Sequence, residues 1–541
     1  MIPTSPTNPT TPPFRILLRG GHVHGARPSA PATALGIEDG RVVFVGDEDR
    51  ALAWTGHGEG APEIVELDGR LVTPAFVDAH VHTVPTGFLH TELDLVGSPS
   101  LADTLERLHD HVAHGESPEG TVVLGTGWDD TLWPEGRPPT ADEIERACPG
   151  RRVHLSRVDA HSAVVSHALA DAVPGLVHLD GWEDSGRVTR EAAHAVTTAL
   201  GSLIGPVQRA AAARQAMRLF AAAGIAAVHE NAAPHIGPEY ELDLVARAAA
   251  EAGLHATLYW GELEAIDAVA RLGVVGLAGD LNVDGAVGSR TAAMREAYAD
   301  APGTTGAAYL DEAQVAAHVV ACTQAGVQAG FHCIGDAALD VITEGFARAA
   351  EKVGHDALRR SRHRLEHVEM PSRRAIEVLS ACGVYASVQP LFDALWGGPE
   401  GMYAERLGER WRAMNPFAEL GWADGITLAF GSDTPVTAVD PWATVRAAVH
   451  PWLESQALLV PEAFRAHTRN GWRAAGDDEQ GSFVRDAPAT YAVWDTPAGL
   501  DPSQPPGLPL PVLDPGAPLP TCVRTVVDGR TVHDRLGEPA P

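Results

Sequence analysis

Residues 73–83 read Thr73-Pro74-Ala75-Phe76-Val77-Asp78-Ala79-His80-Val81-His82-Thr83, an apolar run that ends in two histidines one residue apart. Side chains alternate along a β-strand, so both imidazoles are expected on the same face where the strand ends. Two neutral imidazoles are a sound start for a site that binds Zn²⁺ or a similar ion. The chain has 25 histidines, so the pair alone is weak evidence and its meaning depends on the rest of the sequence.

Seven further apolar runs end in polar or glycine-containing segments, and helical stretches lie between them. The eight runs cover residues 75–78, 226–229, 256–260, 281–284, 327–332, 364–367, 384–389 and 427–431. Strands that alternate with helices are typical of parallel α/β folds. Eight strand–helix units predict a closed (β/α)8 TIM barrel over residues 73–474, with the functional groups at the carboxyl ends of the strands.

The predicted barrel is interrupted once and flanked on both sides. A long polar segment separates its first two strands and predicts an insertion at about residues 85–215. Because this insertion leaves the carboxyl end of a strand, we expect a lid or substrate-recognition subdomain. Residues 14–72 and 475–541 both show short strands with Asp-Gly hairpin turns, which predict one composite β-sandwich domain built from the two ends. Residues 1–13 are expected to be a disordered tail.

The composition narrows the class of protein. The net charge of −31 argues against nucleic acid as a partner, because phosphate binding needs clustered Lys and Arg. No run of about 18 apolar residues occurs, so no membrane span is expected. The five cysteines show no C-x-x-C spacing, and residues 1–13 lack the features of a signal peptide. We therefore expect reduced, buried thiols and a cytoplasmic protein.

Several longer motifs identify a resemblance. They are Gly-Trp-Asp-Asp at 127–130, Arg-Val-Asp-Ala-His-Ser at 157–162, Asp-Gly-Ala-Val-Gly-Ser-Arg-Thr-Ala-Ala at 284–293, His-Cys-Ile-Gly-Asp at 332–336, Glu-His at 366–367, Gln-Pro at 389–390 and Gly-Ser-Asp-Thr-Pro-Val at 431–436. With the His-x-His strand, whose family pattern is P-G-x-x-D-x-H-x-H with Ala75 in place of the glycine, they resemble the amidohydrolase superfamily. The resemblance covers about residues 15–535 and is greatest to the YtcJ-like, N-substituted formamide deformylase-like branch (amidohydrolase 3).

The resemblance implies a metal site made from five positions, which are His80, His82, His332, His367 and Asp433. In the superfamily the aspartate also shuttles protons, and the histidine of the sixth strand polarises the bound water or binds a second metal, so Asp433 and His367 are the expected catalytic residues. The strand count supports this independently, because His332, His367 and Asp433 fall at the ends of the fifth, sixth and eighth predicted strands.

One family feature is missing. Many superfamily members bridge two metals with a carbamylated lysine, often four residues before the Asp-Gly, where this chain has Asp280. The only lysine, Lys352, falls in a predicted helix and is expected at the surface. We therefore favour one divalent metal over two. The ligands suit Zn²⁺ and also Fe²⁺, Mn²⁺ or Co²⁺. Two metals would need a bridging carboxylate, for which Glu230, Asp280 and Asp284 are the candidates.

Five further residues are candidates for substrate binding, namely Trp128, Asp129, His161, Arg290 and Gln389. The first three lie in the predicted insertion, where their alternative role is to hold the insertion together. Arg290 can pair with a substrate carboxylate or, equally, form an intramolecular salt bridge. Gln389 ends the seventh predicted strand and is expected to face the barrel mouth.

The predicted function is metal-dependent hydrolysis of a C–N bond in an amide, N-acyl or N-formyl small molecule. A bound cation lowers the pKa of its water from about 16 towards about 7. Asp433 then accepts the proton and returns it to the leaving nitrogen. Deamination of a nitrogen heterocycle is the alternative, and a metal-free barrel that acts as a binding or scaffold protein is the second alternative. Relatives of this type suggest a homodimer.

Overall fold

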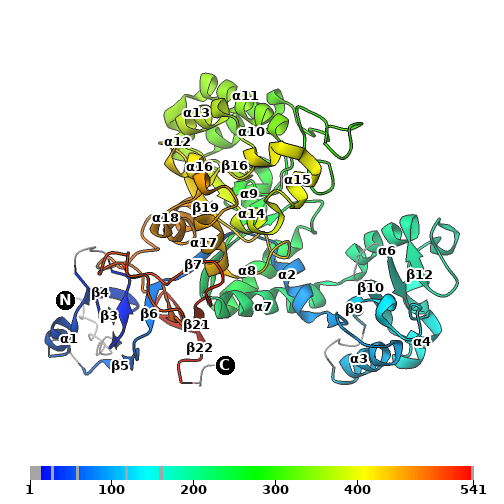
Figure 1. Ribbon diagram of the computed structural model, residues 1–541, viewed down its shortest axis with the longest axis horizontal. Coiled ribbons are helices and arrows are strands. Elements are labelled where there is room, and N and C mark those ends of the chain that lie inside the picture. Colours follow the sequence, from blue (N-terminus) through cyan, green and yellow to red (C-terminus); the bar gives the residue numbers. More distant parts are fainter. Residues whose placement is uncertain (1–13, 26–29, 57–59, 116–119, 158–161, 538–541) are drawn as a thin grey trace, which may run out of the picture. The chain divides into compact units, whose positions relative to one another are not determined.

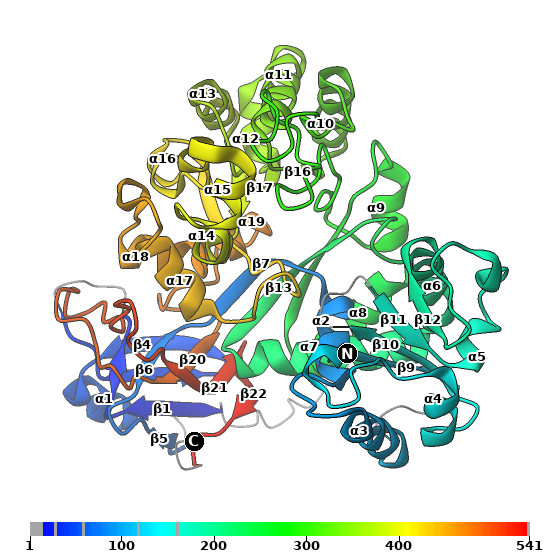
Figure 2. The ribbon, with the colours of Figure 1, turned by 45° about the vertical axis from the view of Figure 1, so that its right-hand side comes forward.

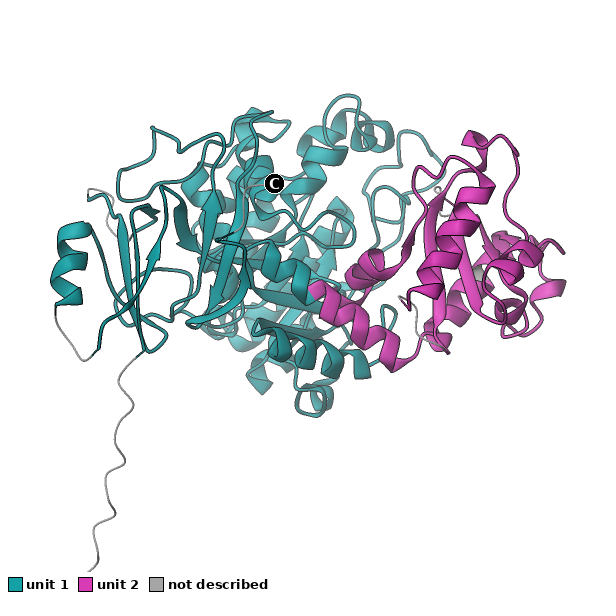
Figure 3. Ribbon diagram, turned by 90° about the horizontal axis from the view of Figure 1, so that it is seen from below, with its two compact units in different colours: residues 1–82, 217–541 teal, residues 83–216 magenta. Residues whose placement is uncertain are grey.

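The computed structural model describes residues 14–25, 30–56, 60–115, 120–157 and 162–537. It divides into two compact units, one formed by residues 1–82 and 217–541 and the other by residues 83–216 (Figure 3). Helix α7 (Pro206–Ala222) crosses from the second unit into the first. The barrel and the two chain ends lie in the first unit, and the insertion after the first barrel strand forms the second.

Eight parallel strands of the first unit form one sheet in which spatial order follows sequence order (Figures 1 and 2). They are β7 (Phe76–Val81), β13 (Ile225–Ala232), β14 (His255–Trp260), β15 (Gly276–Leu277), β16 (Gln328–Cys333), β17 (Arg364–His367), β18 (Tyr385–Val388) and β19 (Thr427–Phe430). The last strand returns to the first: the amide of Asp433 donates to the carbonyl of His80 at 2.8 Å, and the amide of His82 donates to Thr434 at 2.9 Å. The predicted (β/α)8 barrel is confirmed.

The fourth strand differs from its predicted position. We expected residues 281–284, but β15 ends at Leu277, and Asn282 only forms an isolated bridge to His332. Gly279 explains the break: its φ of +83° suits glycine, and a Cβ there would lie 2.8 Å from Oδ1 of Asn231. The chain therefore leaves the regular strand just before Asp280, and residues 280–284 no longer alternate as a strand does.

Helices of the first unit surround the barrel (Figures 1 and 2). They are α8 (Tyr240–Ala252), α9 (Ile266–Leu272), α10 (Glu312–Ala325), α11 (Asp336–Val353), α12 (His355–Ser361), α13 (Arg373–Cys382), α14 (Pro390–Trp396), α15 (Met402–Leu407), α16 (Phe417–Trp422), α17 (Pro441–Val449), α18 (Val460–Ala466) and α19 (Arg469–Ala474). On α11, Leu339, Ile342 and Phe346 recur at helical spacing and are all buried. Lys352 lies in the last turn of that helix and is exposed, as expected.

Two small sheets are built from the chain ends, and the second of them combines strands from both ends. One has the order β4 (Arg41–Gly46), β3 (Ala34–Glu38), β1 (Arg15–Arg19), β5 (Glu63–Glu66). The other has the order β2 (His22–Val23), β6 (Leu71–Pro74), β20 (Tyr491–Asp495), β21 (Thr521–Val527), β22 (Arg530–Asp534). A single apolar core contains residues of both sheets, among them Leu35 and Val493. Helix α1 (Glu48–Thr55) packs on the first sheet through Ala51.

The second unit has its own sheet and core. The sheet order is β12 (Arg187–Thr189), β11 (Ser162–Val165), β10 (Arg152–Arg157), β9 (Val122–Trp128), β8 (Leu93–Asp94). Its helices are α2 (Thr83–Thr91), α3 (Leu101–Ala113), α4 (Ala141–Ala147), α5 (His167–Ala170) and α6 (Arg190–Leu203). Leu95, Trp128 and Ile144 belong to one buried cluster of this unit. The insertion is thus a folded body rather than a long loop.

All five cysteines are buried and unpaired, as the sequence predicts. Over the described parts of the chain, no helix is both long enough and apolar enough to cross a lipid bilayer.

Candidate metal centre

Two histidines and two carboxylates meet at the carboxyl end of β7. His80 Nε2 lies 3.4 Å from Asp280 Oδ1 and 3.3 Å from Asp433 Oδ1. His82 Nε2 lies 3.4 Å from Asp280 Oδ2 and 3.1 Å from Asp433 Oδ1. His80 is fully buried, and His82 and Asp433 are nearly so. The alternating pair of the first strand, the end of the last strand and the break after β15 therefore supply one compact set of nitrogen and oxygen atoms.

Two more histidines extend this set. One possible ligand atom from each of His80, His367 and Asp433 lies within 4.8 Å of the other two. The ring of His332 is centred 4.5 Å from that of His367. His332 lies at the same cavity but belongs to neither group of three possible ligands, and its Nδ1 is 3.7 Å from Asp284. The structure brings all five residues of the predicted site to one barrel mouth, with His332 the most peripheral.

The donor set fits a divalent cation. His80 Nε2, Asp280 Oδ1 and Asp433 Oδ1 are buried and make no hydrogen bond. The ion pairs of Asp280 and Asp433 within the described chain are with His80 and His82. Buried carboxylates without a compensating charge are costly, so two of them facing imidazole nitrogens favour a bound positive charge, which a 2+ ion would supply.

The pKa shifts point to the same demand for positive charge. Burial lowers the pKa of His80, but Asp433, Asp280 and Glu366 outweigh it and raise that pKa well above its usual value. Burial also lowers the pKa of His82, but Asp280 and Asp433 outweigh it and raise that pKa above its usual value. Burial alone would raise the pKa of the Asp280 carboxyl group. The charges of His82 and His80 outweigh burial and hold that pKa well below its usual range. The cluster stabilises a positive charge at the place where the nitrogen atoms converge.

A buried ion pair orients His80. Nδ1 of His80 lies 2.9 Å from Oε2 of Glu366, so the carboxylate accepts the Nδ1 hydrogen and leaves the Nε2 lone pair for the site. Arg364 donates to Glu366 from Nε at 2.6 Å and to the carbonyl of Ala79 at 2.7 Å. The sequence reasoning gave Arg364 and Glu366 no role, although their alternation on β17 is a signal for two side chains that share a face.

Gln389 positions His367. Its Oε1 lies 2.7 Å from His367 Nδ1, and the glutamine is buried, so this end of the Gln389 amide orients the histidine, while the substrate contact of Gln389 stays a prediction. With Oε1 as acceptor, Nδ1 carries the hydrogen and Nε2 presents a lone pair. Burial, followed by the charge of His332, lowers the pKa of His367 to about 3. His367 also adopts a φ of +71°, a strained backbone of the kind found at functional sites.

The three candidate bridging carboxylates lie in different places. Asp280 contacts the histidines as described. Asp284 accepts hydrogen bonds from the amides of Ala293 at 2.9 Å and Gly335 at 2.8 Å, so it organises the loops beside the site. Glu230 is buried in β13 but belongs to neither group of possible ligands found among the described residues. The break at Gly279 explains why Asp280, and not Asp284, reaches the site.

The remaining substrate candidates have structural contacts. In the second unit, Trp128 is buried and donates from Nε1 to the carbonyl of Leu155 at 2.9 Å. Asp129 forms an ion pair with Arg157 at 2.9 Å in the same unit. Arg290 donates from Nε to Asp300 at 3.0 Å, so the intramolecular salt bridge is the alternative that the structure shows. His161 lies outside the described residues.

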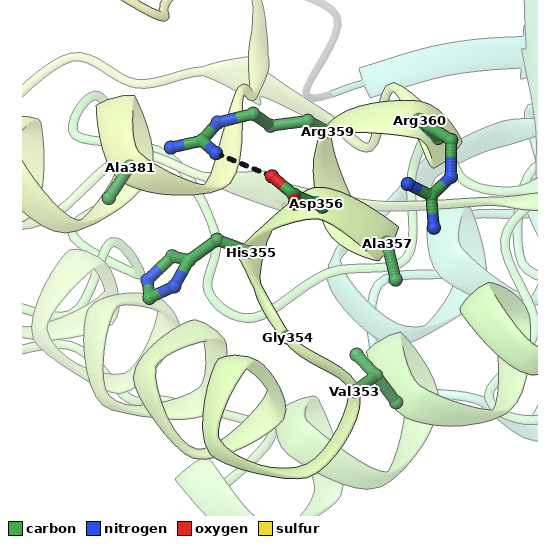
Figure 4. A pocket seen from close by; sticks show the side chains of 8 residues that line it. All are labelled: Val353, Gly354, His355, Asp356, Ala357, Arg359, Arg360 and Ala381. Carbon is green, nitrogen blue, oxygen red and sulfur yellow. Dashed lines mark hydrogen bonds and ion pairs between the residues drawn. The ribbon is translucent and has the colours of Figure 1, made fainter.

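A cavity of about 450 Å³ adjoins the metal centre, a volume usual for a small-molecule site. Its polar side is lined by His82, Asp280, His332, His367, Glu369 and Asp433, and its apolar side by Val287, Ile334, Phe392, Trp396, Met402 and Val436. Glu369, which the sequence analysis missed, is buried here, and burial raises its pKa to about 8. A larger hollow of about 650 Å³ lies at α11 and α12, where Asp356 and Arg359 form an ion pair of 3.1 Å (Figure 4). Neither group of possible metal ligands in the described chain lies at that hollow.

Several known proteins are similar to this chain over most of its length. The chain is 27% identical to the protein LONG AFTER FAR-RED 3 of Arabidopsis thaliana over 90% of this chain and 88% of that protein. It is 24% identical to YtcJ of Bacillus subtilis (96% and 100%) and 23% identical to the N-substituted formamide deformylase of Arthrobacter pascens (86% and 90%). A solved structure of a metal-dependent hydrolase from Pyrococcus furiosus superposes with a TM-score of 0.73 at 24% identity, over 88% of this chain and 98% of that one. That likeness shows a shared fold.

The model of the amidohydrolase family, Amidohydro_3, matches residues 63–533. The chain therefore belongs to this family, and its predicted YtcJ-like, deformylase-like relationship is confirmed. Membership of the family makes the protein a hydrolase.

Proposed function

Starting from membership of the amidohydrolase family, we propose that this protein uses one divalent cation, with Zn²⁺ the first choice, to hydrolyse a C–N bond of an amide, N-acyl or N-formyl small molecule. The observation that carries the proposal is the convergence of His80, His82, Asp280 and Asp433, whose buried nitrogen and oxygen atoms face one another without hydrogen bonds at His80 Nε2 and at Oδ1 of both aspartates. These four residues would hold the ion, with His332 and His367 beside them at the cavity.

When bound, a divalent cation supplies an acidified water and a polarised carbonyl. Asp433 is the group placed to move the proton: its Oδ1 lies at the centre of the cluster, within 3.3 Å of both imidazoles of the first strand. A carboxylate there can accept a proton from water and return it to the leaving nitrogen. His367 is held neutral by burial and oriented by Gln389, so its Nε2 lone pair can ligate the ion or accept a proton.

The choice of a C–N bond rests on the relatives. The formamide deformylase of Arthrobacter pascens aligns over 86% of this chain and acts, by its name, on N-substituted formamides. A cavity of about 450 Å³ with a mostly apolar wall suits a small organic amide.

The experiment combines metal analysis with a substrate panel. Purified protein is assayed for bound metal and then incubated with N-formyl amines, N-acyl amines and amino-substituted heterocycles. We expect one metal ion per chain and release of a carboxylate and an amine from the first two groups. Ammonia release from the heterocycles alone would favour the deaminase, and full turnover in metal-free protein would refute the proposed centre. Two ions per chain would overturn the single-cation proposal and require a bridging carboxylate.

A further inference from the structure

The cavity beside the metal centre contains a carboxyl group that the proposed chemistry does not use. Glu369 follows β17, lines the cavity and is 2% exposed. Its carboxyl group interacts with the hydroxyl of Tyr403, but Oε2 has no hydrogen-bond partner. A buried carboxyl oxygen without a partner is unfavourable, so its presence in a cavity wall calls for a bound donor.

Aromatic rings lead from the metal centre to this group. The ring of Phe392 stacks on His367 with the centroids 5.8 Å apart, and Trp396 packs on Phe392 at 4.7 Å. Tyr403, the partner of Glu369, lies edge-on to Trp396 at 6.3 Å. The aromatic rings therefore connect the metal centre, through His367, to the carboxyl group of Glu369, through Tyr403.

The charges of the cavity are one-sided. Among the described residues that line it, three carry carboxyl groups and none is arginine or lysine. The two nearby guanidinium groups, Arg290 and Arg406, both pair with Asp300. A divalent cation would balance Asp280 and Asp433, but the carboxyl group of Glu369 would still have no cationic partner.

We propose that this cavity selects uncharged or cationic substrates over anionic ones, with Glu369 accepting a hydrogen bond from an N–H group of the substrate whose apolar part lies against Phe392 and Trp396. The inference rests on the proposed function only in taking this cavity as the substrate site. A carboxyl group offers an acceptor oxygen in either protonation state, so the contact needs only a donor within reach. A substrate carboxylate would meet Glu369 with no arginine or lysine to pair with it.

The test measures binding and does not depend on turnover. Metal-loaded protein is titrated by calorimetry with three compounds that share one apolar group: 2-phenylethylamine, 2-phenylethanol and 3-phenylpropionate. We expect the amine to bind at least ~10-fold more tightly than the acid, as for a hydrogen bond with a charged group. Equal or tighter binding of the acid would overturn the inference.

Variants assign the preference to a residue. Glu369→Gln keeps the shape of the side chain, and we expect it to weaken the amine by ~10-fold while the alcohol changes little. Glu400→Gln removes an exposed carboxylate between α14 and α15 and serves as the control for net charge. Trp396→Leu should weaken all three compounds by a similar factor, because it removes apolar contact without changing charge. An amine affinity in Glu369→Gln equal to that of the parent, with the protein folded by thermal melting, would overturn the role of Glu369.

The substrate panel of the proposed function is assayed in parallel. Loss of turnover with the amine preference intact would count against the hydrolase proposal and leave the selectivity standing. Turnover without the preference for the amine would support the hydrolase proposal and count against the selectivity of the cavity.

Discussion

The two walls of the cavity beside the candidate metal centre differ in composition. The wall formed by β7, β19 and the residue after β15 is dense in charge, with two carboxylates and two imidazoles at 3.1–3.4 Å. The wall formed by the end of β17 and by α14 is mostly aromatic, with His367 stacked on Phe392 and held by Gln389. The charged wall suits ion binding, and the aromatic wall suits an organic group. The comparison predicts that changes to His80, Asp280 and Asp433 act through the metal and that changes to Phe392 and Trp396 act through the substrate.

His80→Ala should have the largest effect. It removes the imidazole that contacts both carboxylates, so we expect loss of bound metal and a rate lowered by more than ~10³-fold. Metal content by elemental analysis and turnover are measured together. A metal-free variant with full activity would refute the division of the cavity into an ion side and a substrate side.

Asp433→Asn should follow. The amide cannot accept a proton, so we expect a loss of roughly 10³-fold in kcat with the fold retained. The measurement is steady-state kinetics with circular dichroism as the check on folding. Unchanged kcat would rule out Asp433 as the proton carrier.

Asp280→Asn tests the carboxylate that faces both imidazoles of the first strand. One of the two charges facing the imidazoles disappears, and we expect metal affinity to fall by more than ~10-fold. Competition with a metal-binding dye gives the affinity. If the affinity stays that of the parent protein, Asp280 is not a ligand.

Glu366→Gln should act one step further away. The neutral amide holds Nδ1 of His80 less firmly, and metal affinity should fall by ~10-fold, with activity restored at high metal concentration. The same dye competition, repeated with Glu400→Gln as control, measures it. A fall in kcat that excess metal does not restore would mean that Glu366 acts on the reaction itself.

Lys352→Arg should be silent, with turnover and metal content within ~2-fold of the parent, because an exposed residue away from special features has little effect. The measurement is the same kinetic assay. Collapse of activity would show that the chain depends on a lysine after all.

Much of this arrangement could be read from the sequence. The barrel followed from eight apolar runs, and the positions of His332, His367 and Asp433 followed from their register at strand ends. Local periodicity is enough for such residues because a strand fixes where its last side chain lies.

Other parts depend on contacts that no local pattern carries. Asp280 and Asp284 appeared equivalent until Gly279 broke the strand and directed only Asp280 to the histidines. For Gln389 and Arg290 the sequence left both a substrate and a protein partner open. The structure shows that Gln389 contacts His367 and that Arg290 contacts Asp300. Glu369 lay within no motif, and its burial became visible only once the helices α14 and α15 were in place beside it.

The junction of the first and last barrel strands has one more consequence. Beneath the proposed ligands, Asp78 accepts hydrogen bonds from the amide and the hydroxyl of Ser432, at 2.8 and 2.6 Å, across 354 residues of sequence. An ion bound by His80 on one strand and by Asp433 after the other would link the same two segments a second time. Such a link closes a very long loop of the chain, and it therefore lowers the conformational entropy of the unfolded state. Chelation should therefore loosen the barrel along this line first, with faster amide exchange at Asp433 and His82 than in the strands opposite.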